Sequence, residues 1–217
     1  MKISYNFPSR SRPDKCFKAI ENILSLSRHD DFEIIITADM DDSTMCNNEV
    51  RDKLNSYLNT RVIYGNSKTK VEAVNQNAGL ATGDIICTHS DDMTWIKEGF
   101  DLDILEGFSD GFRGLLHFPD QVAKEHLITY PIMHKDYYKI DNFIYHPDFI
   151  SVYCDNFQQY IAKSRNQYKF VNKQILEHRH AIWGFGEKDA LLLKTEDPVN
   201  YAIDKQTLIR LTQEFNI

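Results

Sequence analysis

Apolar and polar residues alternate in a regular order over the first 90 residues of the chain. Short apolar runs, several of them rich in β-branched residues, are separated by longer stretches whose apolar residues recur with helical spacing. The runs predict strands at residues 2–7, 32–38, 61–64 and 84–89, and the stretches between them predict helices that begin near Pro13 and cover 45–58 and 71–81. Strands that alternate with helices form a parallel sheet, which binds ligands at the carboxyl ends of its strands. We therefore expect an α/β, Rossmann-like fold with a mainly parallel central sheet flanked by helices.

Beyond Trp95 the alternation becomes less regular. Apolar runs predict strands at 114–118 and 127–133, and helical patterns cover 96–108, 155–162, 188–195 and 198–215. No internal repeat, low-complexity tract or linker interrupts this order. We therefore expect a single domain over residues 1–217.

The composition is that of an ordinary globular protein, with 42% hydrophobic and 26% charged residues, which excludes wholesale disorder. The four cysteines include no Cys-x-x-Cys pair, so we expect free thiols rather than a structural zinc site. No apolar run approaches the roughly 18 residues that a membrane span needs, and the N-terminus lacks the apolar core of a signal peptide. We expect a soluble, cytoplasmic protein with no membrane partner.

The net charge of −7 is unevenly distributed along the chain. Residues 84–120 contain nine acidic and two basic side chains, whereas residues 157–180 contain five basic side chains and one acidic side chain. The basic segment, with its interleaved aromatic residues, has the composition of a surface for a polyanion such as nucleic acid with a modified base. Its other explanation, which we favour, is that it balances the acidic stretch inside the fold.

Two adjacent carboxylates are the most informative feature of the sequence. Asp91 and Asp92 follow the predicted strand 84–89, and Asn75 opens the run of residues that leads into this strand. Carboxylate oxygens at the carboxyl end of a parallel strand suit Mg²⁺ or Mn²⁺, which would neutralise a departing diphosphate. An Asp-Asp pair that only caps the next helix is the alternative.

The order of these motifs resembles that of GT-A fold glycosyltransferases, particularly family 2. The matching segments are the acidic loop 39–44, the helix and turn 75–84, and the triplet 90–92, in which Ser90 replaces the usual first aspartate. The resemblance implies a nucleotide-sugar-binding half at about 1–95 and a smaller acceptor-binding half at about 96–217. It also implies a metal-dependent enzyme that moves a sugar from a nucleotide diphosphate donor, most simply a UDP-sugar, to an acceptor hydroxyl.

The resemblance assigns roles to individual residues of the donor side. The expected metal ligands are Asp92 and His178, with Mn²⁺ or Mg²⁺ as the ion. The expected donor-binding residues are Arg10, Arg12, Asp39, Asp41, Asp42, Lys70, Asn75 and Asp91. Turn formation is the alternative for one of the three acids in the 39–44 loop, and an exposed helix position is the alternative for Lys70.

On the acceptor side, three acids compete for the role of catalytic base. Asp155 lies where family 2 places its base, which would give inversion of the anomeric configuration; an N-cap is its alternative role. Glu187 and Asp189 follow a Trp-Gly-x-Gly segment that resembles the acceptor loop of galactosyltransferases. The expected acceptor-binding residues are His180, Trp183 and Gly184.

Three functions are compatible with these features. The first is the metal-dependent glycosyltransferase, with a glycan or small molecule as acceptor. The second is a phage-type glycosyltransferase that acts on modified-base DNA, for which the basic segment 157–180 is the signal. The third is a non-catalytic sugar-nucleotide-binding protein or a nucleotidyltransferase, although the loop 7–13 lacks the glycines that nucleotidyltransferases usually carry.

Overall fold

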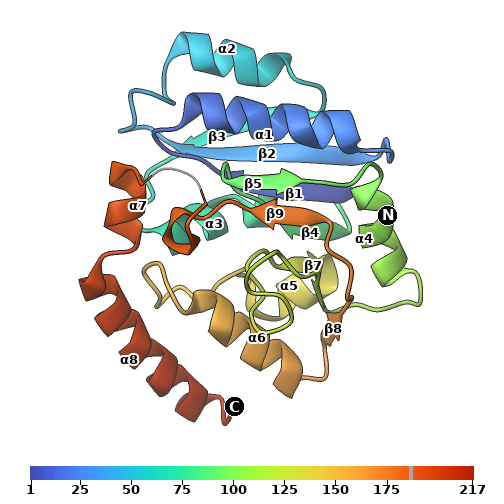
Figure 1. The fold of residues 1–217 in the computed structure, drawn as a ribbon, viewed down its shortest axis with the longest axis vertical. Helices are drawn as coiled ribbons and strands as arrows, with labels where there is room; N and C mark the ends of the chain where they lie inside the picture. The colour runs from blue at the N-terminus through green and yellow to red at the C-terminus, as the bar shows by residue number, and fades with distance from the viewer. Residues whose placement is uncertain (186–187) are drawn as a thin grey trace.

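A computed structural model describes residues 1–185 and 188–217 as one α/β unit (Figure 1). Its main sheet has seven strands in the order β3-β2-β1-β4-β7-β6-β8. The strands are β1 (Ile3–Pro8), β2 (Phe32–Asp39), β3 (Thr60–Gly65), β4 (Ile85–Thr88), β6 (Leu115–His117), β7 (Ile132–His134) and β8 (Tyr168–Phe170). β7 runs antiparallel to β4 and β6, and the other adjacent strands are parallel. The predicted α/β class and mainly parallel sheet are confirmed.

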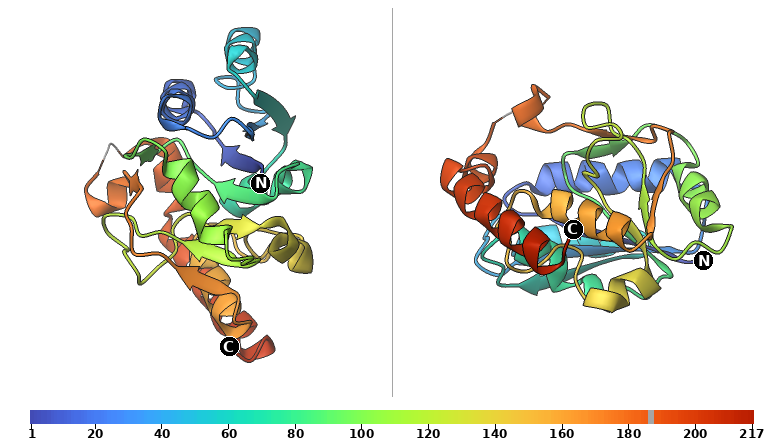
Figure 2. Two further views of the ribbon diagram at one scale, coloured as in Figure 1. Left: turned by 90° about the vertical axis from the view of Figure 1, so that its right-hand side faces the viewer. Right: turned by 90° about the horizontal axis from the view of Figure 1, so that it is seen from below.

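Alternating side chains of the sheet bury two separate apolar layers. In β2, Ile34 and Ile36 belong to one layer and Ile35 to the other, as the two-residue repeat of a strand requires. The first layer is completed by helices α1 (Pro13–Leu26), α2 (Asn48–Ser56) and α4 (Phe100–Phe108). The second is completed by α3 (Lys70–Gln76), α5 (Lys135–Asp141), α6 (Cys154–Ser164) and α8 (Pro198–Glu214). Figure 2 shows that α6 and α8 lie at the end of the molecule opposite α1 and α2.

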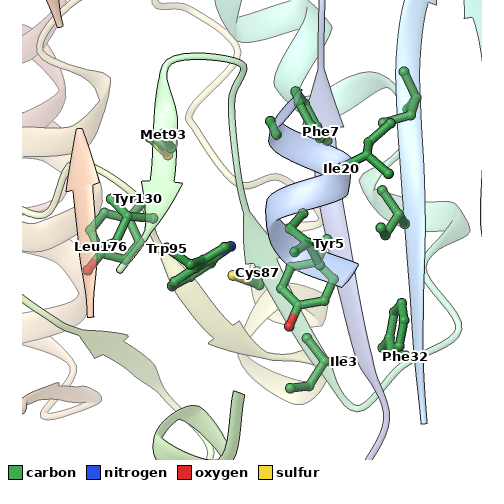
Figure 3. Close-up of a cluster of buried hydrophobic side chains, with 14 of the residues drawn as sticks. Ile3, Tyr5, Phe7, Ile20, Phe32, Cys87, Met93, Trp95, Tyr130 and Leu176 are labelled. Carbon is green, nitrogen blue, oxygen red and sulfur yellow. The ribbon is translucent and has the colours of Figure 1, made fainter. Parts of the chain in front are cut away.

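A second, two-stranded sheet pairs segments that are far apart in the sequence. β5 (Met93–Trp95) is antiparallel to β9 (Leu176–His178), and Met93 is the partner of His178. Trp95 is buried and stacks on Phe100 at a centroid distance of 4.0 Å, and its backbone N–H and C=O both bond the Asn22 carboxamide. Figure 3 shows this tryptophan within the cluster that joins β5 and β9 to the main sheet. β5 is therefore held by β9 through strand pairing and by α1 through the side chain of Asn22.

The strands at 2–7, 32–38, 61–64 and 84–89 are confirmed to within one or two residues. The second half agrees less well. The strand expected at 127–133 forms only at its end, as β7, and the helix expected at 96–108 begins at Phe100, after Gly99 adopts a left-handed conformation with φ 71°. The strand pair β5–β9 and the helix α5 had no clear signal in the sequence.

The basic segment 157–180 is paired with acids of the fold. Lys169 donates to Asp110 at 2.7 Å and Lys173 to Asp103 at 2.6 Å, so two of its lysines bind carboxylates of the acidic stretch 84–120. Arg165 forms a two-bond contact with Asp141. Lys169 and Lys173 thus pair with the acidic stretch as the favoured explanation, internal balance, expects, whereas Arg165 pairs with an acid outside it. The four cysteines are free thiols, and within the described residues we find no helix both long and apolar enough to span a membrane.

Candidate active site

A cavity of about 600 Å³ opens at the carboxyl ends of β1, β2 and β4. The loops after these strands form one side of it, and the start of α6, the end of β9 and the segment from α7 (Ala190–Thr195) to α8 form the other. Ten of the residues predicted from the sequence line it: Arg10, Arg12, Asp39, Lys70, Asp91, Asp92, Asp155, His178, His180 and Trp183. The cavity therefore brings together segments that are up to about 190 positions apart.

Asp92 and His178 meet because β5 pairs with β9. The backbone N–H of Arg179 donates to the Asp92 carbonyl at 2.7 Å, and the His178 Nε2 lies 3.5 Å from the Asp92 Oδ1. Burial by itself disfavours the ionised carboxylate, but the charge of His178 and the hydrogen bond from Ser90 outweigh it, and the pKa of Asp92 falls well below its usual range. The pair thus presents an ionised oxygen and an imidazole nitrogen to the cavity.

Asp92 and His178 are side chains of the kinds that could hold a metal ion. Carboxylate oxygen is a ligand for Mg²⁺ and Mn²⁺, and imidazole nitrogen is a common ligand for transition-metal ions. Over residues 1–185 and 188–217, no group of three or more His, Cys, Asp or Glu side chains converges on one point. The buried Nδ1 of His178 has no hydrogen-bond partner in the described part of the chain and lies 4.0 Å from the Asp120 carboxylate.

Asp91 is turned away from this pair and is committed to Arg12. Its carboxylate accepts from the Ser9 hydroxyl at 2.9 Å and from the Arg12 Nη1 at 2.8 Å. Burial raises the pKa of Asp91, and the guanidinium of Arg12 opposes that rise. Arg12 in turn donates two further hydrogen bonds of 2.7 Å to Asp189. Asp91 thus lines the cavity with both of its carboxylate oxygens already accepting hydrogen bonds from the protein.

The acids of the 39–44 loop divide into three different roles. Asp39 lines the cavity, accepts from the Ser67 backbone N–H at 2.6 Å and pairs with Arg10. Asp41 is exposed and also pairs with Arg10, at 2.6 Å. Asp42 is buried outside the cavity, where it accepts from the backbone N–H groups of Ser11 and Thr44.

Turn formation, the alternative weighed for one of the three acids, is therefore the role of Asp42. Of the remaining two, only Asp39 faces the cavity, so the placement of Asp41 and Asp42 as direct donor ligands is not supported.

The two predicted residues of α3 differ in placement. Thr69 caps this helix by accepting from the Glu72 N–H at 3.0 Å, which directs Lys70 at the helix start into the cavity. Asn75 lies outside the lining: its amide oxygen accepts from the N–H groups of Ile144 and Tyr145, and its nitrogen donates to the Tyr145 carbonyl at 2.6 Å. Asn75 thus joins α3 to the 144–145 segment and does not line this cavity.

The three candidate bases have different environments. Asp155 lies in the first turn of α6, whose N-cap is Tyr153, so capping is not its role. Burial raises the pKa of Asp155, and the nearby Lys70 limits the rise. Asp189 is the N-cap of α7, and the hydrogen bonds from Arg12 lower its pKa to about 2. Glu187 lies outside the described residues.

The acceptor-side prediction is met in part. The rings of His180 and Trp183 line the cavity, and each lies with its centroid 5.3 Å from that of His178. Gly184 lies outside the lining and ends the short helix η2 (Ala181–Trp183) with φ 85°, a conformation suited to glycine. Gly184 therefore forms this turn and does not line the cavity.

Several lining residues were not predicted. Glu196 and Tyr201 come from the junction of α7 and α8, and Ser151 from the loop before α6. None belongs to a local motif in the sequence, because their proximity depends on how α8 packs beside α6 (Figure 1).

The strand order, the single antiparallel strand in a parallel sheet and the position of the cavity define a GT-A glycosyltransferase fold. Among solved structures, the chain is similar to TarS from S. aureus, with a TM-score of 0.64 and 15% identity over 81% of this chain and 36% of TarS. A shorter form of TarS in complex with UDP-GlcNAc has a TM-score of 0.63 at 15% identity, covering 81% of this chain and 57% of that one.

The mannosyltransferase PcManGT from Pyrobaculum calidifontis, in complex with GDP-Man and Mn²⁺, has a TM-score of 0.63 at 13% identity, over 79% of this chain and 54% of that one. This chain therefore spans less than two thirds of the length of each of these structures. No protein-family model and no curated protein sequence matches it.

Proposed function

We propose that the chain is a metal-dependent glycosyltransferase that moves a sugar from a nucleotide diphosphate donor to an acceptor hydroxyl with inversion. The observation that carries this proposal is the convergence of Asp92, His178 and Asp155 on one cavity of a GT-A fold. The complexes of similar structures with UDP-GlcNAc, and with GDP-Man and Mn²⁺, support a nucleotide-sugar donor, and we take a UDP-sugar as its simplest form.

The donor half, about residues 1–95, would bind the nucleotide through Asp39 and the diphosphate through Lys70 and Arg12. Asp92 and His178 would hold Mn²⁺ or Mg²⁺. When bound, such an ion stabilises the negative charge of the leaving diphosphate. Lys70 is suited to the same charge, since it projects from a helix N-terminus into the cavity.

The acceptor half, about residues 96–217, would supply the base. Asp155 lies beside Lys70 and has a raised pKa, so it is a stronger proton acceptor than an ordinary exposed aspartate. It would take the proton of the acceptor hydroxyl at a carboxylate oxygen while that hydroxyl attacks the anomeric carbon. Asp189, with a pKa of about 2, is a poor proton acceptor, which supports the choice of Asp155.

The other candidate functions have less support. Lys169 and Lys173 of the basic segment are bound to acids of the same fold, so they offer little free charge to a polyanion such as modified-base DNA. A non-catalytic sugar-nucleotide binder would have no need for the half-buried, cavity-lining Asp155 at the start of α6. A cytoplasmic location remains part of the proposal.

The test is a thermal-shift panel of UDP-, GDP- and dTDP-sugars, each with and without Mn²⁺, followed by transfer assays with the donor that stabilises the protein. We expect one donor class to raise the Tm only when Mn²⁺ is present. A protein that no nucleotide sugar stabilises, with or without the ion, would refute the proposal.

A further inference from the structure

One wall of the cavity carries polar groups to which the proposed function assigns no role. Glu196 follows the last turn of α7, and Tyr201 lies in the first turn of α8; both line the cavity. The Tyr201 hydroxyl donates to Glu196 Oε2, and the His180 Nε2 lies 3.6 Å from Glu196 Oε1. The carboxylate is thus oriented from two sides, and its side chain is only 9% exposed.

This wall is firmly attached to the segment that presents Asp155. Asp204 of α8 is fully buried and accepts hydrogen bonds of 2.8 to 2.9 Å from the backbone N–H groups of Ile150, Ser151 and Val152. Charge-assisted bonds of this kind are among the stronger ones in proteins. Because Asp204 and Tyr201 are three residues apart, they lie on the same face of α8, and the whole wall is positioned as one unit.

The charge of the wall disfavours an anionic ligand. Glu196 is close enough to Asp155 to act on it electrostatically, so two carboxylates stand on the acceptor side of the cavity. Lys70 acts on both carboxylates, but the two acids outnumber it, so the group keeps a net negative charge that disfavours a phosphate beside it. Lys194, the basic residue of the same segment, instead lies near Asp41 at the donor loop.

The remaining groups of the wall suit a sugar. The ring of Tyr201 packs edge-on against that of Tyr153 at a centroid distance of 5.9 Å. Trp183, at the end of η2, lines the same cavity. Aromatic rings pack against the apolar faces of sugars, and carboxylates accept strong hydrogen bonds from their hydroxyls. Ser151 is buried, lines the cavity, and has a hydroxyl without a partner among residues 1–185 and 188–217. Ser151 holds the loop through its backbone N–H, which donates to Asp204.

We propose that this wall, comprising Glu196 and Tyr201, is an acceptor subsite for an uncharged sugar, with Glu196 accepting a hydrogen bond from one of its hydroxyls. The inference rests on the proposed function, because it places this sugar beside Asp155. It narrows the acceptor to a neutral glycoside and excludes phosphate-bearing acceptors.

Direct binding tests the subsite without relying on transfer. The probes are methyl glycosides of glucose, galactose, mannose and N-acetylglucosamine, with glucose 6-phosphate as the anionic counterpart, measured by saturation-transfer NMR on the donor-free protein. We expect at least one neutral glycoside to bind and glucose 6-phosphate not to bind. Glu196→Gln should weaken the neutral glycoside by about tenfold or more. Glu214→Gln is the control, because Glu214 is an exposed glutamate at the end of α8, outside the cavity lining, and pairs with Arg210.

Tyr201→Phe removes only the hydroxyl that orients Glu196, so it should give a smaller loss and provides the test if Glu196→Gln does not fold. The subsite is refuted if no neutral glycoside binds the wild type, if glucose 6-phosphate binds as well as the neutral sugars, or if the folded Glu196 and Tyr201 variants both bind like wild type. Donor binding is measured separately by thermal shift. If no nucleotide sugar bound while a neutral glycoside still bound in a Glu196-dependent way, the proposed transferase activity would be refuted. The sugar-binding subsite itself would still be supported.

Discussion

The guanidinium of Arg12 donates two hydrogen bonds of 2.7 Å to the carboxylate of Asp189, across 177 positions of the sequence. A third bond from the same group, of 2.8 Å, reaches the buried Asp91. Arg12 thereby ties the loop after β1 to the start of α7, the segment that closes the cavity on the acceptor side. These hydrogen bonds account for the low pKa of Asp189, which makes it a poor proton acceptor.

Replacing Arg12 should lower the stability of the folded protein. Arg12→Ala leaves Asp91 buried without a charge partner, and we expect the free energy of unfolding to fall by about 2–3 kcal/mol, since Asp189 remains partly hydrated. Urea denaturation measures this loss. The control is Lys15→Ala: Lys15 lies 3.6 Å from the same Asp189 carboxylate but is 43% exposed, so it should cost less than about 1 kcal/mol. Equal losses in the two variants would contradict the bridging role of Arg12.

Removing the proposed base should separate binding from catalysis. Asp155→Asn should retain the Kd for the nucleotide sugar and lower kcat at least about 100-fold, since general base catalysis contributes about that much. Asp189→Asn should reduce kcat by much less, because the wild-type carboxylate is bound to Arg12 and, with a pKa of about 2, accepts a proton poorly. Steady-state kinetics with both variants decide the assignment. If Asp189→Asn abolished transfer and Asp155→Asn did not, the base would be misassigned.

The pH dependence of transfer offers an independent check on the base. Burial raises the pKa of Asp155, and only its ionised form accepts a proton. The value of kcat/KM should therefore be constant at high pH and fall as the pH drops through this raised pKa, above the range of an ordinary aspartate. The acid limb should vanish in the residual activity of Asp155→Asn. A limb that persists unchanged in that variant would indicate a different titrating group.

Metal dependence should reside in Asp92 and His178. Asp92→Asn and His178→Ala should each weaken Mn²⁺-supported donor binding by about tenfold or more, because two protein ligands leave little redundancy. EDTA should reduce the wild type to the same level. His126→Ala is a suitable control, since its side chain is 80% exposed and it is absent from the cavity lining. Isothermal titration with and without Mn²⁺ measures the effect, and donor binding that is equally tight in EDTA would contradict it.

The parts of this site that sequence could predict are those carried by local pattern. Asp39 and Asp92 follow recognisable strands, so the fold class and the end of the sheet that binds ligands could be inferred from periodicity alone. Asn75 and Asp42 also occupied motif positions, yet their polar atoms are used by neighbouring backbone. Spacing along the chain does not distinguish a side chain that faces a cavity from one that secures a turn.

Long-range packing decides what the sequence left open. The pairing of β5 with β9 places His178 opposite Met93, although both strands are only three residues long and have little periodicity of their own. Glu196 and Tyr201 reach the cavity because α8 packs beside α6, which no local signal reports. Local propensity predicts each segment by itself and says nothing of which segments pack together. A single sequence therefore does not reveal these contacts.

The buried contact of Asp204 should control both stability and the position of the base. Asp204→Ala removes the acceptor of three backbone N–H groups in the loop before α6, and we expect a loss of about 3–5 kcal/mol in the free energy of unfolding. Asp197→Ala, which removes the single N-cap bond of α8, should cost about 1 kcal/mol. Thermal and urea unfolding compare the two. A similar cost for both would show that the loop does not depend on Asp204.

The paired lysines of the 157–180 segment predict weak, non-specific nucleic-acid binding at most. Lys169 and Lys173 are bound to Asp110 and Asp103, so neither charge is free for a phosphate backbone. Fluorescence anisotropy with a labelled duplex should show no saturable binding at physiological salt, and Lys169→Ala with Lys173→Ala should leave the affinity for the sugar acceptor unchanged. Because both lysines are partly exposed, each substitution should cost less than about 1 kcal/mol. Tight duplex binding that weakened steeply with salt and was lost in the double variant would instead favour a DNA acceptor, and it would overturn the assignment of these lysines to internal charge balance.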